Sequence, residues 1–353
     1  MKIFNSNITL YFSTCLVVFI ILLGACDKNG GDDPIIVPND STPSDSTPSD
    51  SILLEITQSV STIAIGKDNT KWIGTSSGLY KSVSEGYILV DTLGEIEINT
   101  LLFEEELNLL WVGTNNSILK VTLSDADIID YSIISSDNLS NPNINVSYLD
   151  ASSRKWFGTQ TGITLNHDDY WKKDSFRINS IGKVFPLDLE SMQVNSIAAL
   201  NGDYFFATNG GYIYRAIGAD ASVDAFTGAS QWVDPYNGTN LTSNMNVVFI
   251  DSKGNKWMGG ENGIQTHNGN DPKNMEEFRF YNEELVGSII YAVAEAPDGK
   301  IWIGTEAGIS LKNGELWTAI TENLPSLHIT AIAFDKADGS AWIGTKMGLI
   351  NIK

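Results

Sequence analysis

Cysteine is almost absent from this chain of 353 residues: the two that occur, Cys15 and Cys26, both lie near the N-terminus. The body of the chain therefore offers no disulfide framework, no thiolate metal site and no nucleophilic thiol. Histidine is also scarce, and His167, His267 and His328 fall at positions of the repeated unit described below that do not converge. We accordingly expect no metal site, no Ser-His-Asp arrangement and no cofactor.

Basic residues are few as well. The 22 Lys and Arg face 43 Asp and Glu, a formal net charge of −21. This balance disfavours nucleic acid as a partner, because phosphate binding needs a concentrated Lys/Arg surface. It also disfavours docking of the folded part onto an anionic membrane surface. The 42% hydrophobic share is ample for a folded core, so global disorder is excluded.

One long apolar run occurs, from Leu10 to Leu23. It is short for a membrane span and is typical of the apolar region of an export signal. It ends in Leu-Gly-Ala-Cys26, which resembles the lipobox of bacterial lipoproteins. The resemblance implies that Cys26 is acylated and that the segment before it, within residues 1–26, is removed. An uncleaved N-terminal anchor with an incidental cysteine is the alternative. Acyl chains contribute about 0.8 kcal/mol per buried CH₂, so they would hold the protein on a bilayer.

Residues 27–51 are rich in Pro, Ser and Asp and have too little apolar mass to pack, which predicts a flexible tether. The acidic run after Cys26 resembles signals that send lipoproteins to the outer face of the outer membrane in some Gram-negative anaerobes. The Asp-Ser-Thr triplets at Asp40 and Asp45 resemble an O-glycosylation motif of such bacteria, and a plain solvated spacer is the alternative. We therefore expect a lipid anchor in the bacterial envelope, in the outer membrane, with exposure at the cell surface as a further option.

From residue 52 onward, one unit recurs seven times at intervals of about 40 to 50 residues, a period that suits four short strands. Its core is an aromatic residue followed by an apolar residue, Gly and Thr, with small variations. The seven copies begin at Trp72, Trp111, Trp156, Phe205, Trp257, Trp302 and Trp342. Short β-branched runs lie before each copy, and turns such as Asp298-Gly299 connect the two, which predicts consecutive hairpins.

No single unit can bury both faces of its small sheet, so the units are expected to stack radially. The sequence thus predicts an all-β fold, a seven-bladed β-propeller over residues 52–353. The Trp of each copy would fill the space between blades, and the Gly two residues later would leave room for the neighbouring blade. A linear solenoid is the alternative. The last copy stops after its third strand, and we expect residues 52–57 to complete that blade and close the ring.

The aromatic quartets with their Gly-Leu or Gly-Ile follow-on, as at Gly78 and Gly308, and the preceding Asn-Leu segments, as at Asn138 and Asn323, resemble the two-component regulator propeller repeat. The resemblance covers nearly all of residues 52–353. In that family such repeats often form the periplasmic sensor of hybrid histidine kinases, where they help recognise breakdown products of complex glycans. The resemblance implies a sensing or binding propeller. This chain shows no kinase and no downstream spanning helix, so phosphorelay activity is not implied.

Two polar rings are expected to meet around the central pore if each inner strand starts at one face and each second strand ends there. The first ring is the second residue of each inner strand: Ser61, Asn99, Asn145, Asn195, Asn246, Tyr291 and Thr330. The second is the loop after each quartet, including Asn115, Asn116, Gln160, Asn209, Glu261, Asn262, Glu306 and Lys346. Amides and hydroxyls at a pore mouth suit hydrogen bonding to a sugar or another polar molecule. The alternative is that these side chains cap the first hydrogen bonds of the inner strands.

The long connection over residues 218–244 adds Trp232 and Tyr236 as candidate ligand-binding aromatics, with packing as the alternative role. Glu261, Glu306 and Lys346 form the best candidate acid-base set, although such residues are more often solvated loop charges. Three functions follow, in order of preference. The first is an extracytoplasmic binding or sensing propeller for a glycan or other polar ligand. The second is a protein-interaction scaffold in an envelope complex, and the third is a propeller lyase or hydrolase.

Overall fold

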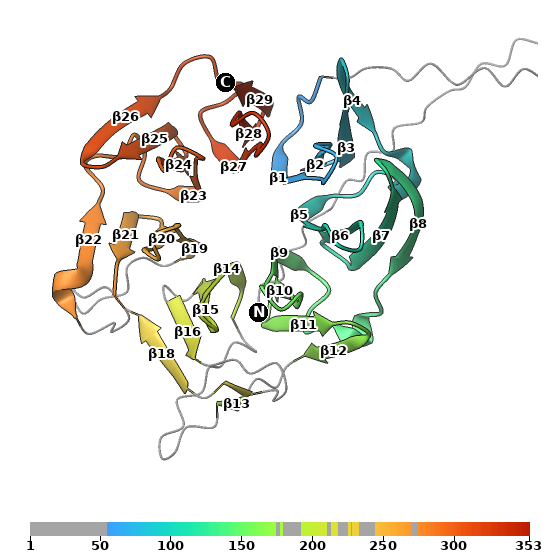
Figure 1. The fold of residues 1–353 in the computed structure, drawn as a ribbon, viewed down its shortest axis with the longest axis horizontal. Coiled ribbons are helices and arrows are strands. Elements are labelled where there is room, and N and C mark those ends of the chain that lie inside the picture. The colour runs from blue at the N-terminus through green and yellow to red at the C-terminus, as the bar shows by residue number, and fades with distance from the viewer. Residues whose placement is uncertain are drawn as a thin grey trace, which may run out of the picture. The chain divides into compact units, whose positions relative to one another are not determined.

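The computed structural model describes residues 55–173, 177–178, 192–209, 213–217, 225–226, 228–232, 244–269 and 274–353. Within these ranges the chain forms β-strands and short 3-10 helices and no α-helix, and no helix has the length and apolar character needed to cross a membrane. The sheets are arranged radially around a central opening (Figure 1). The described part of residues 50–353 is therefore an all-β propeller, as expected from the repeats.

Six sheets have four antiparallel strands each, and they are named blades 1 to 6 in chain order. Blades 1 and 2 consist of β1 (Val60–Ile65), β2 (Lys71–Thr75), β3 (Gly78–Val83), β4 (Gly86–Leu89), then β5 (Ile98–Glu104), β6 (Leu109–Thr114), β7 (Ile118–Ser124) and β8 (Asp127–Ile133). Blades 3 and 4 consist of β9 (Ile144–Leu149), β10 (Lys155–Thr159), β11 (Ile163–His167), β12 (Tyr170–Lys173), then β14 (Val194–Leu200), β15 (Asp203–Thr208), β16 (Ile213–Ile217) and β18 (Gly228–Trp232). Blades 5 and 6 consist of β19 (Met245–Ile250), β20 (Lys256–Gly260), β21 (Gly263–His267), β22 (Phe278–Tyr281), then β23 (Ile290–Glu295), β24 (Ile301–Thr305), β25 (Gly308–Asn313) and β26 (Leu316–Ile320).

The seventh copy of the repeat forms a three-stranded sheet, called the terminal sheet below. It consists of β27 (Ile329–Phe334), β28 (Ala341–Thr345) and β29 (Gly348–Ile352). A separate parallel pair joins β13 (Arg177–Ile178) to β17 (Ala225–Phe226). Short 3-10 helices lie at Asp91–Leu93, Ser136–Asn138 and Met275–Glu277.

The prediction of seven complete blades, the last one completed by residues 52–57, needs correction. Six blades have four strands, and residues 55–57 are not in a strand. Ile56 lies beside β29, where its carbonyl accepts one hydrogen bond from the backbone N–H of Leu349 (3.3 Å). One such bond is not a ladder, because antiparallel pairing needs a repeated exchange of backbone bonds. The side chain of Ile56 is nonetheless buried, at 6% exposure, so this segment is held by apolar packing.

The quartets perform the packing roles expected of them. Trp156 is 2% exposed and packs with Val194, Tyr204 and Phe206 of blade 4, so it fills the space between two blades. A Cβ added at Gly158 would lie 2.7 Å from Cγ1 of Val194, closer than real side chains approach. The absence of a side chain at this position is thus what lets the next inner strand come close.

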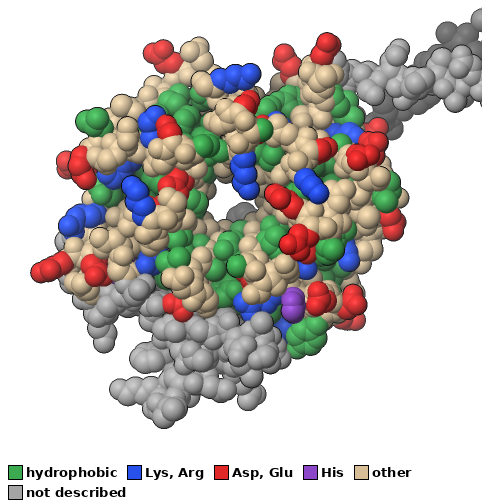
Figure 2. All heavy atoms as spheres, in the orientation of Figure 1, with side chains coloured by type: hydrophobic (Ala, Val, Ile, Leu, Met, Phe, Trp, Pro, Cys, Tyr) green, Lys and Arg blue, Asp and Glu red, His purple; other side chains and the backbone are tan. Residues whose placement is uncertain are grey.

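The terminal sheet lies against blade 1 (Figure 1), as β27 and β28 both contact β1. The Thr330 hydroxyl donates to the Val60 carbonyl. The Lys71 ammonium lies 2.6 Å from the Asp335 carboxylate, and both side chains are largely buried. The opening between the inner strands persists when all side chains are drawn, and charges of both signs surround it on the face shown in Figure 2.

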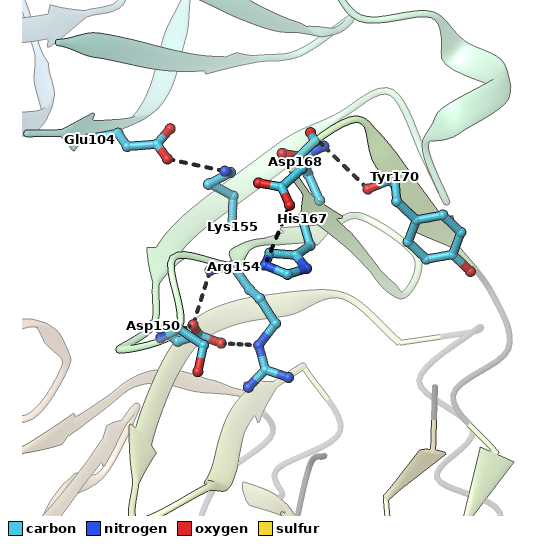
Figure 3. Close-up of polar contacts among 9 residues, drawn as sticks. Glu104, Asp150, Arg154, Lys155, His167, Asp168 and Tyr170 are labelled. Atoms are coloured by element: carbon cyan, nitrogen blue, oxygen red, sulfur yellow. Dashed lines mark hydrogen bonds and ion pairs between the residues drawn. The ribbon is translucent and has the colours of Figure 1, made fainter. Parts of the chain in front are cut away.

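Buried charges connect neighbouring blades at the end of the propeller where the first and second strands of each blade turn (Figure 3). The Lys155 ammonium lies 3.1 Å from the Glu104 carboxylate of blade 2, which also accepts the Trp111 indole N–H (2.9 Å). The Arg154 guanidinium lies 2.7 Å from the Asp150 carboxylate. These pairs sit in the same hairpins as the buried Trp side chains, so indole, cation and carboxylate are satisfied together.

Candidate functional site

A β-bulge occurs at the start of every inner strand. The ladder register shifts between the first and third residues of all seven, so the second residue has no partner in the ladder. A bulge re-aims the side chain of the extra residue. The seven bulge residues are the predicted first ring: Ser61, Asn99, Asn145, Asn195, Asn246, Tyr291 and Thr330.

Six of these bulge side chains bind the backbone of the next sheet. The amides of Asn145, Asn195 and Asn246 donate to the first carbonyl of the following inner strand, at 3.1, 2.8 and 3.0 Å. Asn99 does the same to Ile144 (2.8 Å). Ser61 donates to the Ile98 carbonyl and Thr330 to the Val60 carbonyl. These bonds form a belt of side-chain hydrogen bonds that joins one inner strand to the next, which is a structural use of the predicted ring.

Tyr291 is the exception in this belt. Its ring lies against the imidazole of His328, with ring centroids 4.3 Å apart and an interplanar angle of 31°. Burial raises the pKa of the Tyr291 hydroxyl, and the nearby carboxylates of Glu306 and Glu261 add to that effect. Burial lowers the pKa of His328, as does the Lys346 charge, while Glu306 acts in the opposite direction. His328 is therefore neutral at pH 7 and can both donate and accept hydrogen bonds.

Tyr291 thus lies near the candidate acid-base residues Glu261 and Glu306. His328 lies near Glu306 and Lys346, although the sequence analysis did not include it in that set. The carboxylates in this group are already engaged. Glu306 accepts the backbone N–H groups of Ser288 (3.0 Å) and Ile289 (2.8 Å), and Glu261 accepts the Asn244 amide (2.8 Å). Both brace the segment that leads into the inner strand of their own blade, so an acid-base role stays a prediction.

The other loop residues of the predicted second ring make similar local contacts. The Gln160 amide donates to the Gln193 side chain (3.0 Å), and Asn209 accepts the Gln193 backbone N–H (3.2 Å). The backbone N–H of Lys346 donates to the His328 carbonyl (3.1 Å). Hydrogen bonds thus tie these loops to the residues that precede the inner strands, and they restrain the loops around the central opening.

A cavity of about 340 Å³ opens on this face between blades 1 and 2. Its polar lining includes the predicted loop residues Asn115 and Asn116 together with Glu95 and Glu97. The Asn115 amide donates to Glu97 (2.5 Å), and its oxygen accepts from the bulge residue Asn99 (2.8 Å). The cavity is thereby tied directly to the belt around the pore.

One wall of this cavity is apolar. Tyr131 and Ile133 of the outer strand β8 line it from one side, at 41% and 65% exposure, and Leu93 and Ile96 line it from the connection between β4 and β5. Sequence reasoning did not single out these residues. The alternation of Ile129, Tyr131 and Ile133 with polar residues was a usable signal, because the outer strand of a blade has solvent on its free edge.

Several predicted residues remain untested. Trp232 ends β18, where its backbone pairs with Ile213 of β16, and its side chain lies outside the described part. Tyr236 and Cys26 lie outside the described residues altogether. His167 and His328 belong to opposite ends of their blades, and no group of three metal-ligating side chains occurs in the described ranges.

The radial arrangement of repeated small sheets defines the class of the protein as a β-propeller. The family model "Two component regulator propeller" matches residues 284–307, a segment that contains the whole of the Trp302 quartet. The chain therefore carries a repeat of this family, and the resemblance inferred from the quartets is confirmed. No curated protein sequence matches the chain.

Solved structures resemble the fold across most of its length. A catalytically inactive virginiamycin B lyase from Staphylococcus aureus with quinupristin has a TM-score of 0.61 at 13% identity, over 85% of this chain and 98% of that one. YCF48 from Cyanidioschyzon merolae has a TM-score of 0.61 at 14% identity, over 86% and 97%. A structure titled "YCF48 bound to D1 peptide" has a TM-score of 0.59 at 13% identity, over 87% and 95%. At such identities the likeness concerns the fold alone.

Proposed function

We propose that this propeller is an extracytoplasmic ligand-binding and sensing module, and that its ligand is a glycan or a similar polar molecule bound at the cavity between blades 1 and 2. The observation that carries the proposal is the lining of that cavity: carboxylates and amides on one side, and an exposed tyrosine with aliphatic neighbours on the other. Sugars present hydroxyl groups at their edges and C–H groups on their faces, so this combination suits them.

The carboxylates and amides would accept and donate hydrogen bonds with sugar hydroxyls, while Tyr131 would stack on a sugar face. Asn116 is exposed and its side chain makes no hydrogen bond within the described residues, so it is available to a ligand. Asn115 is held by Asn99 and Glu97 on its two sides. Such a fixed amide costs little further entropy when a ligand binds.

The test is a glycan array followed by titration of the best glycan, with the full chain purified in detergent. Tyr131→Ala should weaken binding at least tenfold, because stacking and apolar contact are lost. Tyr170→Ala is the matched control, since Tyr170 is an exposed tyrosine (53%) on β12, the corresponding outer strand of blade 3. If no glycan binds, or both variants bind equally well, the proposal fails.

A specific observation also favours the second candidate, a scaffold for envelope proteins. The outer strand β8 exposes the side chains of Ile129 (63%), Tyr131 (41%) and Ile133 (65%), and the backbone edge of such an outer strand can pair with an added strand of a partner. Ile129 does not line the cavity. Ile129→Lys should therefore abolish capture of a protein partner while glycan titration stays unchanged, which separates the two functions.

We further propose that Cys26 carries a lipid anchor that holds the module in the bacterial envelope, in the outer membrane. The support is the short apolar run that ends in Leu-Gly-Ala-Cys26 and the Pro-, Ser- and Asp-rich segment that follows. Cys26→Ser should move the protein from the membrane fraction to the soluble fraction of the cells. Retention of this variant in the membrane would contradict the anchor and would leave the glycan proposal untouched.

A further inference from the structure

A second cavity lies at the opposite end of the propeller, between blade 6 and the terminal sheet. It measures about 440 Å³ and is lined by the turn residues Ala296 and Lys300, by Trp302 and Phe334, and by the next hairpin at Leu316. The rings of Trp302 and Phe334 meet edge to face with centroids 5.4 Å apart. These residues belong to the ends of the strands away from the bulges, so this cavity is independent of the proposed glycan site.

Ala296 of this cavity occupies a position that holds an aspartate in blades 3 and 5. Asp150 and Asp251 each stand six residues before the blade's tryptophan and accept its indole N–H, at 2.9 Å from Trp156 and 3.0 Å from Trp257. In blade 6 the corresponding residue is Ala296. The backbone is the same in all three, because residues 150, 251 and 296 each donate to the carbonyl four residues later, at 3.0, 3.0 and 2.8 Å.

Blade 1 confirms that this position faces the indole nitrogen. It has Gly66 there, and a Cβ added at Gly66 would lie 3.5 Å from the indole nitrogen of Trp72. A carboxylate placed on such a Cβ can therefore reach the N–H group. In blade 6 no carboxylate does so, and the indole of Trp302 makes no hydrogen bond within the described part of the chain.

The aromatic ring beside the tryptophan also differs between the two junctions. Between blades 3 and 4, Tyr204 packs against Trp156 with ring centroids 4.5 Å apart and an interplanar angle of 38°, and its hydroxyl donates to Asp150 (2.5 Å). Tyr204 directly precedes the quartet of blade 4, and the residue directly before the terminal quartet is Ala341. The positions of that aromatic ring and of the carboxylate are thus both alanine at this junction, and the ring beside Trp302 comes instead from Phe334, the ladder partner of Ala341.

The cation that pairs with Asp150 in blade 3 has a counterpart in blade 6. Arg154, two residues before Trp156, binds Asp150 at 2.7 Å. Lys300, two residues before Trp302, binds Asp298 at 2.6 Å, and these side chains are 40% and 53% exposed. Water screens an exposed ion pair of this kind, and the pair contributes little to stability, so Lys300 can turn to another carboxylate at little cost.

We propose that this cavity binds an aryl carboxylate. The ligand's carboxylate takes the place that Asp150 has in blade 3, where it accepts the Trp302 indole N–H and pairs with Lys300. Its ring lies against Trp302, beside Phe334. The volume is within the range of small-molecule sites. The walls combine apolar side chains, among them Leu311, Leu316 and Phe334, with Asn313, Thr318 and the Asp298–Lys300 pair. The ligand's carboxylate therefore has to draw Lys300 away from Asp298.

The test uses 3-phenylpropionate as the probe and 3-phenylpropanamide as its uncharged analogue, titrated into the full chain in detergent with tryptophan fluorescence and calorimetry as readouts. The carboxylate should bind at least tenfold more tightly than the amide. Trp302→Phe keeps an aromatic ring but removes the N–H donor, so this variant should lose most of that preference. Equal binding of the two probes to the wild-type chain would overturn the proposal.

Ala296→Asp supplies a second, independent test. It should restore the internal carboxylate, raise the melting temperature and reduce binding of 3-phenylpropionate at least tenfold. Ala307→Asp adds the same charge at the other end of blade 6 and should leave binding unchanged. A dipeptide ending in phenylalanine, compared with 3-phenylpropionate, then shows whether a peptide C-terminus or a free acid is the preferred source of the carboxylate. Undiminished binding by a folded Ala296→Asp variant would contradict the inference.

Discussion

At the scale of the residue, Asp150 shows how a buried charge is accommodated between two blades. One oxygen of its carboxylate accepts hydrogen bonds from Arg154 (2.7 Å), Trp156 (2.9 Å) and Tyr204 (2.5 Å), and the other accepts two backbone N–H groups. Burial by itself raises the pKa of Asp150, but the bonds from Trp156 and Tyr204 and from the backbone outweigh it, so the pKa lies below the ordinary value of 3.8. The ionised form is therefore the one that stabilises the fold.

This arrangement predicts a large effect of Asp150→Asn at pH 7. The substitution leaves the Arg154 guanidinium buried without its counter-charge, and breaking a buried pair costs about 3–5 kcal/mol in free energy of unfolding. Urea unfolding measures the loss. Asp298→Asn is the control, because its ion pair with Lys300 is exposed and should be worth about 0–1 kcal/mol. Similar losses in the two variants would contradict the role assigned to Asp150.

The pH dependence follows from the same pKa. Because the pKa of Asp150 is lower in the folded chain than in the unfolded chain, its contribution is complete above the unfolded value of 3.8 and is lost as the pH falls through the lowered folded value. The wild-type stability should thus fall more steeply at acid pH than that of Asp150→Asn. Unfolding curves recorded from pH 7 down to pH 3 test this difference.

At the scale of the element, the inner strands owe their spacing to the bulge residues. The sequence identified these positions because they recur in every unit, and it left open whether they bind a ligand or the backbone. The repeat located these positions but not the bulge, because a bulge is a property of the pairing between two strands, in which one residue has no partner. Tyr291 is the one position where the structure departs from the belt: the sequence analysis grouped it with the other six, and the structure places its ring against His328.

The belt gives a direct prediction at Asn145, whose amide donates to the Val194 carbonyl (3.1 Å). Asn145→Ala should reduce the free energy of unfolding by about 1 kcal/mol, the typical net value of one hydrogen bond. Asn145→Asp should cost more at pH 7, because a carboxylate cannot donate and would face the carbonyl oxygen. Chemical denaturation at pH 7 compares the two, and an Asp variant as stable as wild type would contradict the donor role.

At the scale of the whole molecule, the sequence predicted the propeller class and the packing of Trp and Gly between sheets from the repeat alone. It overstated the number of complete blades, since the prediction relied on Ile52–Thr57 having strand character and on the third strand of the last copy lacking a partner. The structure holds Ile56 by its buried side chain and one backbone bond. Local β propensity cannot distinguish such an apolar contact from a ladder. Both cavities depend on pairings between blades that no pattern within one repeat contains.

Contacts between the first and last sheets repeat those between sheets that follow one another in the chain. Lys71 pairs with Asp335 (2.6 Å) and lies 5.2 Å from the ring centroid of Trp342. Lys155 pairs with Glu104 (3.1 Å) and lies 5.6 Å from that of Trp111. If the ring is closed in solution, a substitution that overpacks the junction between blade 1 and the terminal sheet should lower the free energy of unfolding as much as one at the junction between two consecutive blades.

Gly344 and Gly158 allow that comparison with matched substitutions. A Cβ at Gly344 would lie 2.6 Å from Cγ1 of Val60, as a Cβ at Gly158 would lie 2.7 Å from Cγ1 of Val194. Overpacking of this kind costs about 1–3 kcal/mol. Gly158→Ala should show that loss of unfolding free energy in any case, because blades 3 and 4 are consecutive. Gly344→Ala should show an equal loss if the terminal sheet packs on blade 1. A loss near zero in Gly344→Ala alone means that the ring opens at this junction, because the new methyl group then no longer meets Val60.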